Sequence, residues 1–377
     1  MESEPEADDD STLSNMASEL MSRGMSEEEA WDYLGRKMPE LMDKSGAILL
    51  EALKDEAPEM LKDRLATRTR FRRRLQKEWG EPFRLLRMLA EMVREVGREF
   101  NAKHRPSAAA DNDLVFEALL RLHQRACLLV EEVFCLLEGG FASGAHSRWR
   151  TLHEVTIVSY FIEESGQDVA ERYLLHHVVE TCKSAEIFQQ HCESLGQEPL
   201  TDDELQQHRD ARESLCNRFG KAYRLDWGWA ADALNDPNPS FTSIERAVKL
   251  EHLRPYFRLA CHPNHAGSIA LRNDLGSSLN PDDSMMVMSS ASNAGLAEAG
   301  IGTALSLYQV TVNLLNHYEI DSLRTLTELG AMKLLSDEVH EAFAMVDERL
   351  AIKAPIIRER LSRFEALNEK KPEADKP

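Results

Sequence analysis

The sequence is poor in the features that mark secreted, membrane-spanning and disulfide-bonded proteins. Its six cysteines among 377 residues include no Cys-x-x-Cys pair, which argues against a disulfide framework or a zinc site. No apolar run approaches the roughly 20 residues needed to cross a bilayer, and the first ten residues, MESEPEADDD, are too acidic for a signal peptide. We therefore expect a cytoplasmic protein with reduced thiols and no membrane contact.

Signals for β-structure are also scarce. Aromatic residues make up 7% of the chain, and runs of β-branched residues are few. Leu, Ala, Glu, Arg and Met, which favour helices, recur instead. With no internal repeat and no convincing strand pair, the sequence predicts an all-α fold with a central antiparallel helical bundle, an N-terminal helical extension and a C-terminal helical tail.

The spacing of apolar residues places the helices. It predicts four long ones over 82–103, 113–138, 141–164 and 168–194, separated by breaks at Pro106, at the two glycines 139–140 and at Gly166. Breaks this short favour antiparallel neighbours in a bundle. Another long, apolar helix is expected over 297–317, and shorter helices are expected over 202–218, 244–260, 320–330, 335–348 and 351–367, with a loop over 268–292.

Three regions follow from this pattern. Residues 1–80 form an acidic, partly disordered helical region, in which Ser26 and Glu29 make a capping-box pattern and Pro58 interrupts a helix. Gly80 and Pro82 are taken as its boundary. Residues 81–320 form the helical bundle, and residues 321–377 form C-terminal helices and a polar tail.

The net charge of −20 is distributed unevenly. Residues 1–61 hold 17 acidic and 5 basic side chains, whereas residues 62–77 hold 8 basic and 1 acidic. An acidic protein repels nucleic acid unless its basic residues are concentrated. The basic helix 62–77, with Arg70, Arg72, Arg73 and Arg74, is therefore a candidate nucleic-acid surface. The alternative is a solvated face that the acidic N-terminal segment neutralises.

The helix over 141–164 carries the most unusual polar pattern. His146, Arg150, His153 and Glu154 share one face at separations of three and four, and Arg150 is placed to pair with Glu154. Charged groups on an otherwise apolar helix are costly unless they are paired. Two interpretations remain open: a buried polar site, or a structural ion pair that fixes helix packing.

Two further polar clusters are candidates for the wall of such a site. Tyr173 and His177 share a face of the following helix, and Tyr256, His262 and His265 surround a helix end at Pro263. The Glu-x-x-His pattern of di-iron bundles is absent, so we expect no metal and no cofactor.

The residues over 118–173 resemble an uncharacterised bacterial helical family, the domain of unknown function 5677. The resemblance rests on order and spacing, and it continues through Tyr256, His262 and His265 to a C-terminal part near residue 320. It is carried first by Arg125, Leu136-Leu137-x-Gly139, Ala145, Arg150-Thr151-Leu152-His153-Glu154 and Ala170-x-x-Tyr173. The family often has Ser where this chain has Cys261. The resemblance implies an all-α fold over roughly residues 84–320 and no established activity.

Three functions remain open, and the sequence does not decide whether the protein is an enzyme. The first is a binding module for a protein partner or small effector, with a pocket at Arg150, Glu154, Tyr173, His177 and Tyr256. The second is a metal-independent endoribonuclease of a toxin or phage-defence system, which would act as a homodimer through an Arg-x(4–6)-His pair. The catalytic candidates are then drawn from Arg150, Glu154, His153, His262 and His265, and the two pairs are Arg148 with His153 and Arg258 with His265. The third is a regulator that binds RNA or DNA through helix 62–77.

Overall fold

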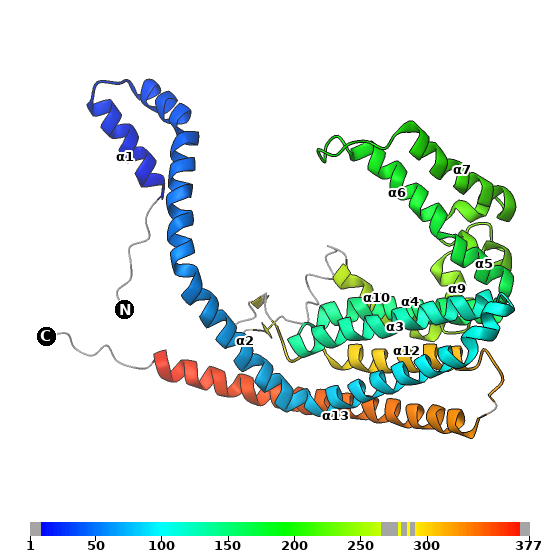
Figure 1. The fold of residues 1–377 in the computed structure, drawn as a ribbon. Coiled ribbons are helices and arrows are strands. Elements are labelled where there is room, and N and C mark those ends of the chain that lie inside the picture. Colours follow the sequence, from blue (N-terminus) through cyan, green and yellow to red (C-terminus); the bar gives the residue numbers. More distant parts are fainter. Residues whose placement is uncertain (1–8, 265–277, 280–284, 287–290, 321, 370–377) are drawn as a thin grey trace. The chain divides into compact units, whose positions relative to one another are not determined.

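The computed structural model describes residues 9–264, 278–279, 285–286, 291–320 and 322–369, and this part of the chain is almost entirely helical (Figure 1). The all-α fold class is confirmed. The exception is a two-residue antiparallel strand pair within the expected loop, β1 (Ser278–Leu279) with β2 (Met285–Met286), in which Ser278 is paired with Met286. The long helices are α1 (Asp9–Ser22), α2 (Glu27–Ala110), α3 (Leu114–Gly139), α4 (Ala142–Ser165), α6 (His177–His191), α7 (Asp202–Phe219), α12 (Ala297–Leu315) and α13 (Leu323–Glu369).

Shorter helices join the long ones. They are α5 (Gln167–Leu175), η1 (Lys221–Arg224), η2 (Gly228–Ala230), α8 (Ala231–Leu234), α9 (Phe241–Ala247), η3 (Glu251–Leu253), α10 (Arg254–Cys261) and η4 (His262–Asn264). The predicted fourth long helix is therefore divided at His176, and the predicted helix 244–260 is divided into α9 and α10. At the first of these places His176 is buried, and its ring nitrogen lies 3.1 Å from the carbonyl oxygen of Tyr223.

The helix α2 is continuous over 84 residues, so the breaks predicted at Pro58, Gly80, Pro82 and Pro106 are wrong. A proline costs a helix interior about 3 kcal/mol and a glycine about 1 kcal/mol. Around residue 80 this cost is offset by burial, because one face of α2 packs into the core through Trp79, Phe83, Leu86 and Leu89. Likewise the three helices expected after residue 320 are one helix, α13.

The chain divides into two compact units, residues 1–71 and 72–377. In the first unit, Ala17 of α1 and Ala30 and Leu34 of α2 are buried. The predicted capping box at its helix start is confirmed, since the backbone N–H of Glu29 donates to Ser26 Oγ (3.3 Å) and the backbone N–H of Ser26 donates to the Glu29 carboxylate (2.8 Å).

The core of the second unit is built on α12, which packs against α3, α4 and α13. Small residues allow this close packing. The backbone of Gly300 lies against the ring of Phe343 on α13, and that of Gly302 lies against the indole of Trp149 on α4, so neither position has room for a side chain. The indole N–H of Trp149 donates to Ser306 Oγ (3.2 Å), which satisfies the polar group inside the core.

One polar cluster joins the ends of three helices of this core. His317, just after α12, lies 2.8 Å from Asp113 at the start of α3 and 2.9 Å from Glu163 near the end of α4. Asp113 also caps α3 by accepting from the backbone N–H of Phe116 (2.9 Å). Burial alone would lower the pKa of His317, but its hydrogen bonds to the two carboxylates raise it above its ordinary value. We call His317, Asp113 and Glu163 the His317 clasp.

Candidate functional site

The predicted ion pair of α4 is formed and is only partly covered. Arg150 Nη2 lies 2.9 Å from Glu154 Oε1, and the two side chains are 29% and 22% exposed. Arg150 Nε donates to Cys261 Sγ at the end of α10 (3.1 Å), and its guanidinium lies over the ring of Phe257 (4.9 Å). Burial raises the pKa of Glu154, and Arg150 offsets only part of that shift. The arginine is thus held in one orientation at a place that solvent reaches.

A fully buried polar network lies next to this pair. His153 and Glu245 are both 0% exposed, with His153 Nε2 3.4 Å from Glu245 Oε1. Glu245 also forms an ion pair with Arg254 at the start of α10. A histidine buried this completely contacts no ligand in this arrangement, so His153 is placed as a structural group that ties α4 to α9.

Two phenylalanine rings join the network to the exposed pair. Phe241 and Phe257 stack at 5.0 Å, and the guanidinium of Arg254 lies 5.5 Å from the centre of the Phe257 ring. Phe257 therefore lies between Arg150 and Arg254. We call this set, Arg150, Glu154, Cys261, Phe257, His153, Glu245, Arg254 and Phe241, the Arg150 site.

The sequence interpretation missed Glu245, Arg254 and Phe241. Their positions depend on short helices whose ends are set by local signals: Ser240 caps α9 with Ser243, and Pro255 lies in the first turn of α10. A usable signal did exist. Phe241, Ile244 and Glu245 are spaced by three and four, which places the carboxylate on the apolar face of α9, where a charge needs a partner.

Of the two predicted wall residues after α4, the structure brings one towards the site. Tyr173 lies edge-on to Trp229 (5.0 Å), and Trp227, which contacts Trp229, also contacts Phe241 (5.6 Å). His177 is exposed and its Nδ1 lies 2.9 Å from the carbonyl oxygen of Leu174, a neighbour in its own turn. The described interactions therefore connect Tyr173, but not His177, to the Arg150 site.

The third predicted cluster is only partly described. Tyr256 is 53% exposed, and His262 begins η4 directly after Cys261. His265 lies outside the described residues, as does any pairing of Arg258 with it. In the other predicted pair, Arg148 and His153 point to different neighbours: Arg148 donates to Glu132 on α3 (3.1 Å), whereas His153 faces α9.

The predicted basic surface lies within α2. Arg70, Arg72, Arg73 and Arg74 are all exposed. Among the described residues, no three His, Cys, Asp or Glu side chains come together in a way that could hold a metal ion. Within the same residues, no helix is long and apolar enough to cross a membrane.

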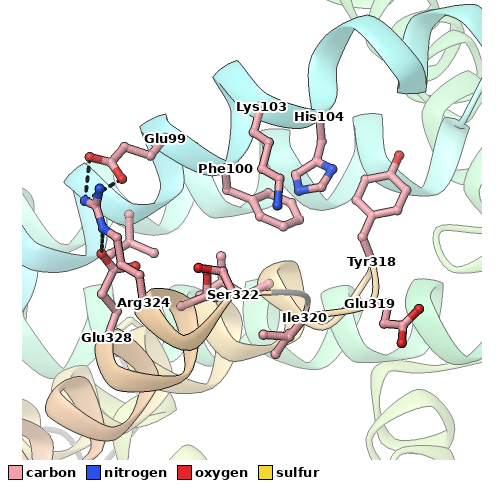
Figure 2. Close-up of a pocket in the computed structure, with 13 residues that line it drawn as sticks. Glu99, Phe100, Lys103, His104, Tyr318, Glu319, Ile320, Ser322, Arg324 and Glu328 are labelled. Carbon is pink, nitrogen blue, oxygen red and sulfur yellow. Dashed lines mark hydrogen bonds and ion pairs between the residues drawn. The ribbon is translucent and has the colours of Figure 1, made fainter.

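A cavity of about 240 Å³ lies elsewhere in the second unit, between α2, the end of α12 and the start of α13 (Figure 2). Phe100, His104 and Tyr318 form an aromatic wall, in which the last two rings stack at 4.5 Å. The guanidinium of Arg324 is bound by Glu99 and Glu328 across the opposite side. Arg324 is thus engaged by two carboxylates, whereas Arg150 is engaged by one.

Residues 116–284 match the sequence model of a family of unknown function (DUF5677), a range that includes the whole Arg150 site and excludes the cavity beside Tyr318. No curated protein and no solved structure matches the chain significantly. The resemblance predicted from the motif around Arg150 is thereby confirmed over residues 116–284, which are similar to this family of unknown function.

Proposed function

We propose that the protein is a cytoplasmic helical binding module that holds an anionic group of a protein partner or small effector at Arg150. The observation that carries this proposal is the state of Arg150: a guanidinium that is oriented by three neighbours yet remains 29% exposed. A carboxylate or phosphate is the natural ligand for such a group, because the planar guanidinium matches its two oxygens.

The neighbours of Arg150 reduce the cost of binding. Its Nε is directed by Cys261 Sγ and its face rests on Phe257, so the long side chain is already ordered before a ligand arrives. An arginine that is ordered in advance loses less conformational entropy when it binds. The buried network of His153, Glu245 and Arg254 supports this arrangement, since it fixes the helix that carries Phe257.

Glu154 acts as an internal competitor for the ligand. An incoming anion has to replace the Glu154 carboxylate on Arg150, and the two negative charges repel each other. Burial already raises the pKa of Glu154, so its neutral form is within easier reach than that of an exposed glutamate. Anion binding is therefore coupled to proton uptake by Glu154, and we expect affinity to increase as the pH falls towards the pKa of Glu154.

The positions of the candidate catalytic residues favour binding over RNA cleavage. His153 is fully buried against Glu245, and Arg148 is engaged by Glu132 on α3. General acid-base catalysis needs a histidine within hydrogen-bond reach of the substrate, which His153 does not have in this packing.

The test is anion binding by the purified full chain, measured by thermal melting and calorimetry. The probes are inorganic phosphate, a nucleoside monophosphate and a short peptide with a free carboxyl end. We expect at least one probe to raise the melting temperature of the wild type and of Glu154→Gln, with tighter binding to Glu154→Gln, and to have no effect on Arg150→Ala.

Arg148→Ala is the matched control, because Arg148 lies two residues earlier on α4, is 38% exposed and is also paired with a glutamate. It should bind as the wild type does. Equal loss of binding in Arg148→Ala and Arg150→Ala would contradict a specific site, as would the absence of binding by every probe. RNA cleavage that survives EDTA and is lost in folded Arg150→Ala or His265→Ala would establish the nuclease alternative instead.

A further inference from the structure

Both ring nitrogens of His317 face a carboxylate in the His317 clasp. Nδ1 lies 2.9 Å from Glu163 Oε2, and Nε2 lies 2.8 Å from Asp113 Oδ2. Carboxylate oxygens only accept hydrogen bonds, so both contacts need an N–H on the ring. A histidine ring has two N–H groups when it is charged, whereas the neutral ring has one N–H and one lone pair. The clasp is therefore complete only while His317 carries its positive charge.

The two carboxylates differ in how firmly they are held. Asp113 accepts three further hydrogen bonds, from the backbone N–H of Phe116 (2.9 Å), the Tyr318 hydroxyl (2.8 Å) and the Gln167 side chain (3.3 Å). In the described part of the chain, Glu163 has no hydrogen-bond partner besides His317, and its side chain is 27% exposed against 13% for Asp113. When His317 becomes neutral, Glu163 is therefore the carboxylate that turns away, and Nε2 keeps its proton towards Asp113.

The clasp closes one end of a packing seam between α4 and α12. Gln309, Asn313 and His317 are separated by four residues, which places them in one stripe along α12 and the residues that follow it. The Tyr160 hydroxyl of α4 donates to the carbonyl oxygen of Gln309 over a long 3.4 Å. Among the described residues, the buried atoms Gln309 Oε1 and Asn313 Nδ2 have no hydrogen-bond partner. We call Tyr160, Glu163, Gln309, Asn313 and His317 the α4–α12 seam.

Unsatisfied polar atoms weaken the closed form of this seam, because a buried donor or acceptor without a partner is destabilising. Water that enters an opened seam supplies the missing hydrogen bonds of Gln309 and Asn313. The contact between Glu163 and the charged His317 opposes this opening, because it joins the end of α4 to the residues after α12 by a charge-assisted hydrogen bond.

We propose that His317 acts as a proton-operated latch on the α4–α12 seam. The charged ring holds the end of α4 against the end of α12, and release of the Nδ1 proton to solvent frees Glu163 and opens the seam. The residues after α12 stay attached to the start of α3, because the Nε2–H still donates to Asp113. The latch is independent of the anion site at Arg150.

The groups around His317 set the pH at which the latch opens. They are Asp111 and Asp113 before α3, Tyr160 and Glu163 of α4, Tyr318 beside the ring and, on the cavity side of Tyr318, Lys103 and His104 of α2 (Figure 2). Burial lowers the pKa of His317, but hydrogen bonds to Glu163 and Asp113 raise it above its ordinary value. Burial raises the pKa of Tyr318, so that hydroxyl keeps its proton. We therefore expect a closed seam below the ordinary histidine value of 6.5 and an open seam above the raised value.

The test follows hydrogen–deuterium exchange of the purified full chain by mass spectrometry at roughly pH 6 and roughly pH 9, on either side of the range in which histidine titrates. Rates are corrected for the effect of pH on the exchange of an unfolded peptide. In the wild type, we expect amides at the end of α4 and around Gln309 and Asn313 to exchange about tenfold faster at the higher pH, the effect of losing one hydrogen bond to a charged group. Amides in the middle of α3 should not change.

Substitutions of Glu163 distinguish a latch from a contact that only packs. In Glu163→Gln the side-chain amide donates to the neutral Nδ1 or accepts from the charged Nδ1–H, so the seam should stay closed at both pH values. In Glu163→Ala the seam should be open at both. The matched control is Glu164→Gln, the next residue of α4 and an exposed one, which should switch as the wild type does. His104→Gln should also switch, because the pH dependence is assigned to His317.

Nitrogen-15 NMR of the histidine rings gives a second readout. The His317 signals, identified by their loss in His317→Gln, should show both nitrogens protonated at roughly pH 6 and Nε2 alone protonated at roughly pH 9. Equal exchange of the wild type at the two pH values would overturn the latch, as would an unchanged pH dependence in Glu163→Gln or a neutral ring protonated on Nδ1. Loss of the pH dependence in His104→Gln would assign it to the other histidine and would also overturn the proposal.

Discussion

The buried network beside Arg150 allows a quantitative test of how this domain is held together. In the variant Arg254→Ala, the Glu245 carboxylate, which is 0% exposed, keeps only His153 at 3.4 Å as a partner. Removing one member of a buried ion pair costs about 3–5 kcal/mol, because the remaining charge stays desolvated and uncompensated. Arg254 is 26% exposed, so water enters part of the vacated space, and we expect the lower end, about 3 kcal/mol.

The assay is unfolding of the purified full chain by heat, followed by circular dichroism. For a large domain, 1 kcal/mol shifts the melting temperature by about 2–4 °C, so Arg254→Ala should melt about 6–12 °C lower than the wild type. The matched control is Arg246→Ala, an exposed arginine next to Glu245 in the sequence, which should change stability by less than about 0.5 kcal/mol.

A second variant distinguishes the loss of the attraction between Glu245 and Arg254 from the cost of leaving the Glu245 carboxylate buried without its partner. Replacing both partners, Glu245→Leu with Arg254→Leu, removes the desolvated carboxylate, and hydrophobic replacement of a buried pair is often neutral or stabilising. We expect the double variant to regain most of the stability that Arg254→Ala loses. The reasoning is refuted if Arg254→Ala melts within about 2 °C of the wild type, or if the double variant is as unstable as the single one.

Three further predictions concern the rest of the second unit. Because the pKa of His317 is raised on folding, the stabilisation that it supplies is complete below its unfolded value of 6.5 and is lost as the pH rises through the higher folded value. Denaturant titrations at increasing pH should therefore show a decline in the free energy of unfolding of the wild type that is absent in His317→Gln. Gly302→Ala places a methyl group 2.5 Å from the indole of Trp149 and should destabilise by about 1–3 kcal/mol, whereas Gly330→Ala meets no described residue outside its own helical turns within 4 Å and should stabilise α13 by about 0.5–1 kcal/mol. Equal melting temperatures would contradict this packing. Thr201→Ala removes the capping box of α7 and should cost about 1 kcal/mol in chemical denaturation, and no change would show that this helix end does not limit stability.

The places where sequence reasoning was wrong share a physical cause. Glycine and proline were taken as helix ends at Gly80, Pro82 and Pro106, but these residues only add a local cost. Whether the helix continues depends on what its apolar face gains, and Trp79 and Phe83, both almost fully buried, pack against Phe343 of α13, more than 250 residues away in the chain. Periodicity reports that a face is apolar, but it does not report which distant helix covers it.

Local interactions were predictable because they lie within reach along one helix. The all-α class, the capping box at Ser26 and the pairing of Arg150 with Glu154 all follow from residue type and from separations of three or four. The motif around Arg150 was also enough to indicate the family that residues 116–284 match.

Tertiary structure alone decided what surrounds that pair. Arg150 meets Cys261, which is 111 residues later, and His153 meets Glu245, which is 92 residues later. These contacts depend on how α9 and α10 fold back over α4, and that path is set by the summed packing of many side chains, which no spacing in the sequence records. For the same reason His153 and Glu154, neighbours on one predicted polar face, have different environments: one is fully buried, and the other remains within reach of solvent.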